Sequence, residues 1–194
     1  MRDPVGLFLA WPWLGALLWA VLHSLDFYLT LWGARLYRTA GKDHIEFEGS
    51  YELNPVWEKT VDRGLVFPPR FAVSIVVVGA LFWGFAWLAG RAGSFGAWSL
   101  ALLLGALVFT RVGVIALHAQ NIWLYRHIAR GGAMEGHVRY SRKTALGISA
   151  VRWTGLAALL AAAALVAPSP WLWGGAGGLV LLGAKTSILY LRRK

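Results

Sequence analysis

Five apolar stretches of roughly 20 residues or more, separated by short polar segments, constrain this chain more than any other feature. A helix rises about 1.5 Å per residue, so about 20 apolar residues cross a hydrocarbon core about 30 Å thick. Only 14% of the 194 residues are charged, against about 25% in typical soluble domains. The sequence therefore predicts an all-α transmembrane helical bundle. Residues 1–194 would form a single integral membrane domain, and the protein would be a multi-pass protein of the cell membrane.

The predicted spans end where polar residues, prolines or glycines interrupt the apolar stretches. They cover residues 5–37, 71–89, 95–125, 144–167 and 171–191. The first is long for one crossing, so we expect it either to tilt or to begin as an interfacial helix near Pro12. Within the polar segment 38–69, Asn54 and Pro55 predict the start of a short helix ending at Gly64, because Asn caps helices and Pro is favoured at their first position.

The distribution of basic residues predicts the orientation of the chain. In a five-span protein the loops 38–69 and 126–143 lie on the same side as the C-terminus. That side carries fourteen lysines and arginines, whereas the other carries only Arg2 and Arg91. The positive-inside rule therefore predicts that the N-terminus is outside and that both loops and the C-terminus are cytoplasmic, in bacteria at the cell inner membrane.

The same distribution of basic residues indicates which kinds of partner to expect. The net charge of +10 is accounted for by loops that flank membrane spans, so we predict no nucleic-acid partner. The lipid bilayer is the expected surrounding. Glycine and alanine crowd the last two spans, and small residues let helices approach closely in lipid. We interpret these runs as packing surfaces, through which an oligomer is also possible.

Apart from Arg35, which lies at the end of the first predicted span, four charged residues lie inside the predicted spans: Asp26, Arg111, Arg152 and Lys185. Charged groups at membrane depth are costly and usually face the interior of a bundle. Lys185 is close to the end of its span, where a long side chain can extend to the interface. The other three are expected to form a polar cluster in the cytoplasmic half of the bilayer.

Helical periodicity indicates which of these residues share a face. Asp26 and Thr30 lie on one stripe of the first span, and Arg111, His118 and Asn121 lie on one stripe of the third. At about 1.5 Å per residue the two stripes overlap in depth. They form one site only if the first and third spans pack face to face.

The charges of this cluster do not balance. Asp26 is the only acid within the spans, and it faces cations that include Arg111 and Arg152. A buried surplus of positive charge requires anions. These would come from Glu52, if the loop folds back, or from an anionic ligand such as a lipid phosphate or a small anion. With Glu52 in place, Asp26 and Glu52 would alternatively form a small cation or proton site.

Metal and cofactor chemistry find little support in the sequence. The chain has no cysteine, which excludes disulfides and thiolate ligands. His23 with Asp26, and His118 with Asn121, are each one helical turn apart, but neither pair forms a diagnostic motif such as His-Glu-x-x-His. We predict no metal site, and the sequence identifies no cofactor.

One part of the chain resembles a known family. Asp26-x-x-x-Thr30, followed after a polar loop by Glu52-x-Asn54-Pro55, is similar to a pattern in small bacterial and archaeal polytopic membrane proteins classed as a domain of unknown function. The likeness covers about a quarter of the chain, and the loop between the two motifs is longer here. The resemblance implies no activity, but it implies that Asp26, Thr30, Glu52 and Asn54 act as one unit.

Three functions remain open at this point. The first is a cytoplasm-facing polar pocket that binds or transports an ion or small anionic solute. The second is a lipid-active enzyme that holds a head-group phosphate and uses His118 or Asp26 as a general base. The third is a structural or assembly subunit in which the polar cluster only sets helix registry. The candidate binding residues are Asp26, Thr30, Glu52, Asn54, Arg111, His118, Asn121 and Arg152.

Overall fold

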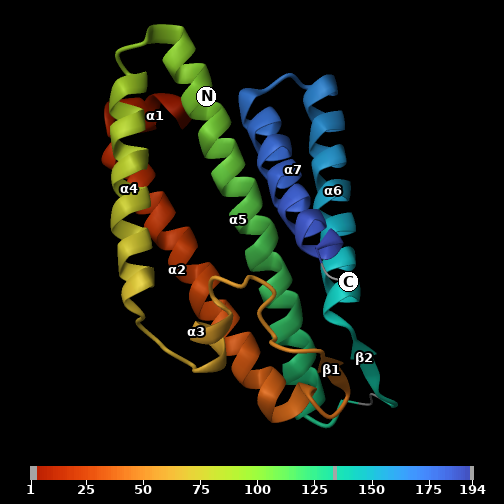
Figure 1. Ribbon diagram of the computed structural model, residues 1–194. Coiled ribbons are helices and arrows are strands. Elements are labelled where there is room, and N and C mark those ends of the chain that lie inside the picture. Colours follow the sequence, from red (N-terminus) through yellow and green to blue (C-terminus); the bar gives the residue numbers. More distant parts are fainter. Residues whose placement is uncertain (1–3, 133–134, 193–194) are drawn as a thin grey trace.

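The structure of the protein is a computed structural model that describes residues 4–132 and 135–192. The fold is an all-α bundle, as predicted, and in the described part of the chain five helices are long and apolar enough to cross a membrane (Figure 1). In chain order the elements are α1 (Pro4–Ala10), α2 (Trp13–Leu36), the π-helical turn η1 (Tyr37–Gly41), β1 (Ile45–Phe47), α3 (Glu58–Asp62), α4 (Pro69–Ala89), α5 (Gly93–Ala129), β2 (Val138–Tyr140), α6 (Arg142–Val166) and α7 (Pro170–Leu191).

The first membrane-length helix differs from the predicted range of residues 5–37 at both ends. Pro12 separates α1 from α2, because proline has no N–H to continue the helical hydrogen bonds. The membrane-length helix starts at Trp13 and continues through η1 to Gly41. At Gly41 a side chain would meet the ring of Tyr125, with its Cβ 2.6 Å from the nearest ring carbon, so this tight contact requires glycine. The third span is also longer than predicted, because α5 covers 93–129 rather than 95–125.

The helices pack in two groups that share α5. α2 packs against α4 and α5, while α7 packs against both α5 and α6. The main contacts of α6 are with α7 and β2. In Figure 1 the α6–α7 hairpin accordingly stands beside α5, on the opposite side from α4. The small residues predicted to be packing surfaces serve this arrangement within the chain: a Cβ on Gly105 would overlap the backbone of Trp171, and one on Gly174 would overlap that of Leu102.

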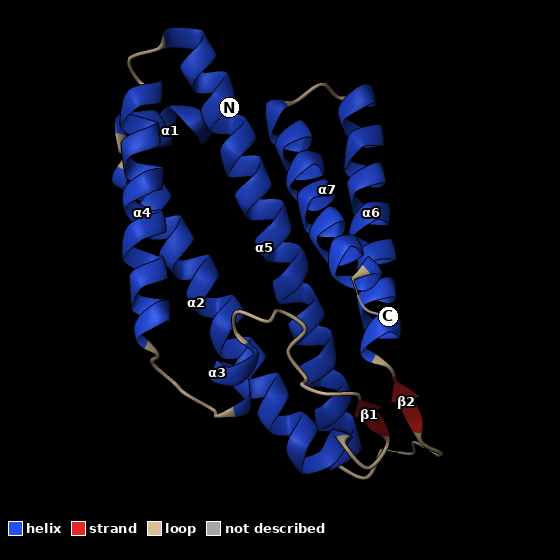
Figure 2. Ribbon diagram, viewed as in Figure 1, coloured by secondary structure: helices blue, strands red, loops and turns tan. Residues whose placement is uncertain are grey.

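Two short strands join the polar loops at one end of the bundle (Figure 2). β1 and β2 pair in parallel, with Ile45 opposite Val138. Nothing in the sequence predicted this pairing. Beside it, the guanidinium of Arg142 donates two hydrogen bonds to the carboxylate of Glu58, with N–O distances of 3.0 and 2.7 Å. The strands and this ion pair hold the loop that follows β1 against the start of α6.

The predicted helix in the first polar loop is present but shorter. Asn54 starts it: its side-chain Oδ1 accepts from the backbone N–H of Val56 and its carbonyl accepts from the N–H of Glu58, at 3.3 and 3.0 Å. Regular helix, however, covers only Glu58–Asp62. The chain then turns through Gly64, whose φ of +63° disfavours other residues. Val61 packs into the protein, with 1% of its surface exposed.

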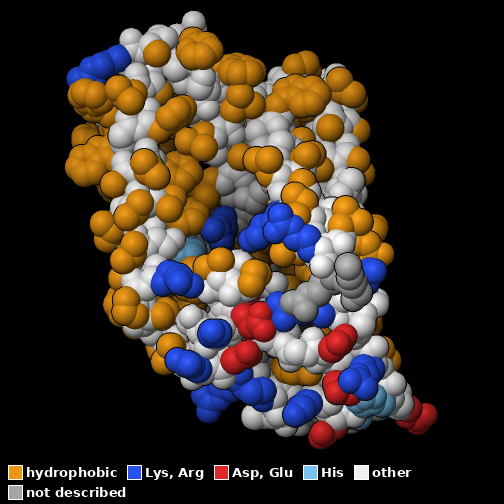
Figure 3. Space-filling view, in the orientation of Figure 1, with side chains coloured by type: hydrophobic (Ala, Val, Ile, Leu, Met, Phe, Trp, Pro, Cys, Tyr) orange, Lys and Arg blue, Asp and Glu red, His pale blue; other side chains and the backbone are white. Residues whose placement is uncertain are grey.

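The surface is polar at one end. Figure 3 shows Lys, Arg, Asp and Glu gathered over the loops and strands, whereas hydrophobic side chains cover most of the rest of this face. The orientation of that end towards the cytoplasm stays a prediction.

Candidate functional site

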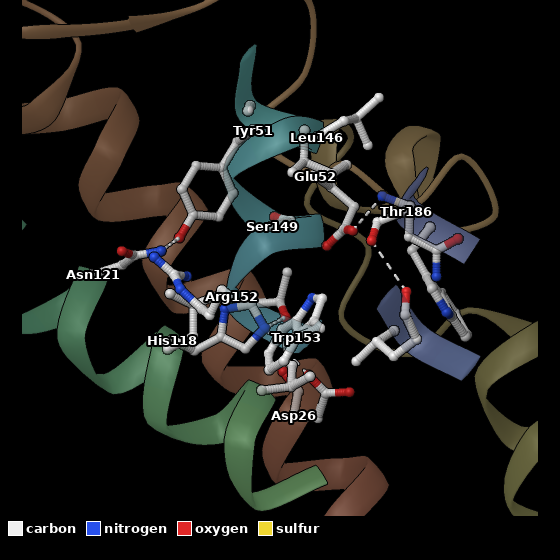
Figure 4. A pocket seen from close by; sticks show the side chains of 18 of the residues that line it. Asp26, Tyr51, Glu52, His118, Asn121, Leu146, Ser149, Arg152, Trp153 and Thr186 are labelled. Atoms are coloured by element: carbon white, nitrogen blue, oxygen red, sulfur yellow. Dashed lines mark hydrogen bonds and ion pairs between the residues drawn. The ribbon is translucent and has the colours of Figure 1, made fainter. Parts of the chain in front are cut away.

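A cavity of about 700 Å³ lies between α2 and α5 on one side and α6 and α7 on the other. The loop after β1 contributes to its wall. All eight residues singled out by the sequence line this cavity: Asp26, Thr30, Glu52, Asn54, Arg111, His118, Asn121 and Arg152. Figure 4 shows Asp26, His118, Arg152 and Glu52 turned towards the same space from four different segments. The face-to-face packing of the first and third spans, on which the site depended, is therefore present.

Asp26 is the centre of the contact between α2 and α5. Its Oδ2 accepts a hydrogen bond from the guanidinium of Arg111, and its Oδ1 lies 3.2 Å from Nε2 of His118. The same Nε2 lies 2.9 Å from the hydroxyl oxygen of Thr30. Arg111 also stacks over the ring of Trp19, with its guanidinium carbon 4.7 Å from the ring centre. Both carboxylate oxygens of Asp26 are thus occupied by donors on α5.

The loop after β1 folds back into the bundle and brings Glu52 to the cavity. The hydroxyl of Ser50 donates to the carboxylate of Asp62 at 2.7 Å and accepts from the N–H of Glu52 at 3.1 Å. Oε1 of Glu52 in turn accepts from the N–H of Asn54 at 2.7 Å. These local bonds orient the Glu52-x-Asn54 motif, so the Glu52 carboxylate lines the same space as Asp26.

Burial raises the pKa of the Glu52 carboxyl above its usual value. The hydrogen bond from Asn54 and the charges of His118 and Lys185 act in the opposite direction, and the charge of Asp26 adds to the rise. Desolvation outweighs the stabilising contacts. Glu52 is therefore easier to protonate than an exposed glutamate.

Tyr51, which the sequence did not single out, closes the site next to Glu52. Its hydroxyl oxygen lies 3.4 Å from Nδ2 of Asn121 and faces Gly33, where a Cβ would approach it to 2.7 Å. Burial raises the pKa of Tyr51 to about 12, so the phenol is neutral. The signal that could have revealed this residue was Gly33, which lies on the same stripe of α2 as Asp26 and Thr30.

Arg152 and Lys185 line the cavity from α6 and α7. Arg152 lies about 15 Å further along α6 than Arg142, well inside the predicted span. Among residues 4–132 and 135–192, no hydrogen bond or ion pair to the Arg152 side chain is found. Lys185 is exposed and acts on Glu52 through its charge. The sequence suggested that the Lys185 side chain extends to the membrane interface, and it did not predict that this residue also lies beside the cavity.

His23 also lines the cavity and is almost fully buried, with 4% of its surface exposed. Its ring lies between those of Trp19 and Phe71, with centres 4.8 and 5.3 Å away. Trp57 from the loop covers a further side at 5.9 Å. Neither ring nitrogen has a hydrogen-bond partner in the described part of the chain.

The carboxylates that line the cavity are poorly suited to bind a cation, because they already accept hydrogen bonds. Asp26 already accepts from Arg111 and His118, and an oxygen of Glu52 accepts from a backbone N–H. Within the ranges that the structure describes, no three His, Asp or Glu side chains are grouped so that they would hold a metal ion. The cation or proton site formed by Asp26 and Glu52 is the less favoured of the two hypotheses left open by the sequence.

Comparison with protein-family models, curated proteins and solved structures finds no match to this chain. The resemblance of the Asp26 and Glu52 motifs to a family of unknown function therefore stays a prediction.

Proposed function

We propose that the cavity binds a phosphate-bearing amphiphile, with the anionic head beside Arg152 and Lys185 and the apolar part along α5 and α7. The alternative sources of such an anion are a membrane lipid and a soluble phosphate ester. The sequence-based hypothesis of a small anionic solute is thereby narrowed to an anion with an apolar tail. Transport and lipid chemistry would both begin with this binding step.

The unpaired guanidinium of Arg152 carries the proposal. Arg111 has Asp26 as its counter-ion and Arg142 has Glu58. Arg152 lines the same cavity without a carboxylate partner in the described ranges. An uncompensated cation at membrane depth is unfavourable, and a bidentate guanidinium fits phosphate oxygens well. The Glu52 carboxylate lines the same cavity but makes no ion pair with Arg152 in the described ranges.

The shape and lining of the cavity favour an amphiphile over a free anion. Leu117, Leu181 and Leu182 line it together with the charged residues. Figure 3 shows this face of the molecule hollowed between the two helix groups, with Lys and Arg side chains at the lower rim and hydrophobic side chains above. An opening towards the side of the bundle would admit a lipid from the bilayer, with its head group at the polar end.

Replacing Arg152 with glutamine tests the proposal. Hydrogen bonds to charged groups contribute about 1.5–3 kcal/mol, so we expect Arg152→Gln to weaken binding of short-chain phosphatidylmethanol by roughly 10- to 100-fold. The measurement is isothermal titration calorimetry of the full chain in a neutral detergent. Arg63→Gln, an exposed arginine outside the cavity, is the matched control and should bind as the wild type does.

Two reference ligands complete this experiment. Phosphatidylcholine has the same chains without net charge, and inorganic phosphate has the charge without chains. Both should bind at least about tenfold more weakly than phosphatidylmethanol. Equal binding of phosphatidylcholine, or an unchanged affinity in Arg152→Gln, would refute the proposal.

Glu52→Gln tests the electrostatics of the site through the pH dependence of stability. A carboxyl with a raised pKa binds its proton more tightly when folded than when unfolded. Its contribution to stability is therefore complete below the unfolded pKa and is lost as pH rises through the folded pKa. We expect the wild type to lose stability relative to Glu52→Gln as pH rises from below the ordinary carboxyl pKa of 4.5 towards neutrality, by about 1.4 kcal/mol for each tenfold difference in proton affinity.

The measurement is thermal unfolding of both proteins across that pH range. The difference between them removes most of the contribution of other titrating groups. Glu135→Gln, at an exposed position, should follow the wild type at every pH. Parallel curves for the wild type and Glu52→Gln would show that the Glu52 carboxyl is not buried as described.

A further inference from the structure

Arg152 on α6 and Lys185 on α7 lie at the same level of the bundle. The two helices form an antiparallel hairpin (Figure 1), and a close contact at Gly183 gives its register. A Cβ on Gly183 would lie 3.1 Å from Oγ1 of Thr154 and 3.6 Å from the Cβ of Trp153. Lys185 follows Gly183 by two residues, and Arg152 precedes that contact on α6 by one to two residues. Because the helices run in opposite directions, the two cations are level.

Both side chains face the cavity and can be reached from it. Arg152 is half-buried and Lys185 is exposed, and both line the cavity. Lys185 shares one stripe of α7 with Leu182 and Leu189, which line the same space. Its charge also opposes the rise in the pKa of the Glu52 carboxyl, which is a further cavity residue. The cavity therefore presents two neighbouring positive charges, one from each helix of the hairpin.

The chain supplies too little negative charge for these two cations. In the part of the chain that the structure describes, neither forms an ion pair with a carboxylate. Two acids of that part line the cavity, and Asp26 is already paired with Arg111. Glu52 could balance one charge at most, and it is easier to protonate than an exposed glutamate. Two like charges at membrane depth are unfavourable, so a ligand that carries two negative charges compensates them best.

A third donor lies next to these cations. Ser149 is one helical turn before Arg152 on the same face of α6, and it lines the cavity. Figure 4 shows both residues among the side chains around this space. Within residues 4–132 and 135–192, no hydrogen bond to the Ser149 hydroxyl is found. A guanidinium, an ammonium and a hydroxyl group are thus available. An unsubstituted phosphate group offers three acceptor oxygens and nearly two negative charges, whereas a phosphodiester has only two free oxygens and one charge.

We propose that the head of the ligand is a terminal phosphate, a phosphomonoester, which Arg152 and Lys185 hold between α6 and α7. The ligand class is an amphiphile whose apolar part is joined to the phosphate by a single ester bond, such as a phosphatidic acid or a lipid alcohol phosphate. This inference rests on the proposed function, because it names the head group that the same cavity binds. It also assigns Lys185, together with Arg152, to the binding site.

Two lipids that differ by one methyl group test this specificity. Phosphatidic acid has a terminal phosphate, and phosphatidylmethanol is the same molecule with one phosphate oxygen methylated. At pH 8, above the second phosphate pKa of about 6, phosphatidic acid is mostly a dianion. One further charged hydrogen bond corresponds to about a 10- to 100-fold difference in affinity. We expect the full chain in neutral detergent to bind short-chain phosphatidic acid more tightly than phosphatidylmethanol by that factor, as measured by isothermal titration calorimetry.

Substitutions at Lys185 separate recognition by this pair from general attraction to a basic protein. In Lys185→Gln one of the two cations is lost, so the ratio of the two affinities should fall to within about threefold of one. Lys185→Arg keeps the charge, and most of the preference should remain. Lys59→Gln is the matched control, because this exposed lysine lies in the first polar loop and does not line the cavity. It removes the same net charge and should leave the ratio unchanged.

The outcomes distinguish this inference from the proposed function. If phosphatidic acid and phosphatidylmethanol bind equally, but both more tightly than phosphatidylcholine, the cavity recognises a phosphodiester and the monoester inference is wrong. A preference that survives in Lys185→Gln, or that falls equally in Lys59→Gln, would also contradict it. If neither lipid binds more tightly than phosphatidylcholine, the proposed function itself fails.

A soluble phosphomonoester identifies the source of the phosphate. Free sn-glycerol 3-phosphate carries the same terminal phosphate as phosphatidic acid but has no acyl chains. We expect it to bind at least about tenfold more weakly, because the apolar wall of the cavity contributes to binding of the lipid. Equal affinity would overturn the lipid source and make the ligand a soluble phosphomonoester. Each preference is a ratio within one variant, so a lower yield of folded protein does not alter it.

Discussion

Replacing Asp26 with asparagine is expected to lower the free energy of unfolding by about 3 kcal/mol. The Asp26 carboxylate is the counter-ion of Arg111 and the acceptor for His118, and the side chain of Asp26 is only 15% exposed. An amide of the same size keeps one acceptor oxygen but removes the charge. Arg111 would then be a cation without a counter-ion in the contact between α2 and α5. Removing one partner of a buried pair costs about 3–5 kcal/mol, and the partial exposure of this pair places the loss at the lower end.

The measurement is unfolding by sodium dodecyl sulfate in mixed micelles, followed by helical circular dichroism. Asp43→Asn, an exposed acid in the first polar loop, is the matched control and should change stability little. Arg111→Gln in the Asp26→Asn background removes the stranded charge, so the double variant should recover part of the loss. If Asp26→Asn unfolds at the same detergent fraction as Asp43→Asn, the Asp26–Arg111 pair does not stabilise the contact between α2 and α5.

The same variant bears on the choice between a binding site and a structural cluster. A purely structural role predicts a tightly paired Asp26 with no space beside it. The pairing is present, but so is a cavity of about 700 Å³ lined by the pair and by Arg152. Asp26→Asn should therefore reduce stability, whereas Arg152→Gln should reduce lipid binding with little loss of stability. If both substitutions changed only stability, the structural role would be the better account.

The site was largely predictable because helical periodicity determines which residues share a face. Asp26 and Thr30 are four residues apart on α2, and His118 and Asn121 are three apart on α5, so each pair must face the same way. Because exposing Asp26 to lipid is unfavourable, the stripe on α2 is expected to face the polar stripe on α5. The same reasoning predicted the five membrane-length helices, because their length and hydropathy are local properties of the sequence.

The remaining features depend on contacts between distant parts of the chain. The pairing of β1 with β2 joins Ile45 to Val138, and three-residue strands have no periodic pattern to reveal them. The position of Glu52 depends on Ser50 and Asp62, which fold the loop back by side-chain hydrogen bonds. The break at Pro12 was one of the two alternatives that the sequence left open, since the length of the first span was compatible either with tilting or with a start as an interfacial helix near Pro12.

Replacing Gly174 with alanine is expected to lower the free energy of unfolding by about 3 kcal/mol or more. Gly174 lies on α7 where a Cβ would overlap the backbone carbonyl of Leu102 on α5. A backbone atom cannot rotate away as the end of a side chain can, so the two helices would have to separate. Gly177→Ala, three residues further along α7, is the matched control, because a Cβ added there would meet no atom within 4 Å. It should leave stability unchanged or raise it slightly, since alanine favours helix.

The consequence of the Gly174 substitution for binding follows from how the α6–α7 hairpin is attached. α7 packs on α5 and carries Lys185, and α6, which carries Arg152, packs mainly on α7. A displacement of α7 from α5 would therefore move both cations away from Asp26 and His118. We expect Gly174→Ala to weaken phosphatidylmethanol binding together with stability, and Gly177→Ala to weaken neither. If Gly174→Ala were as stable as Gly177→Ala and bound the lipid equally well, the close contact of α5 with α7 would not be what positions the two halves of the cavity.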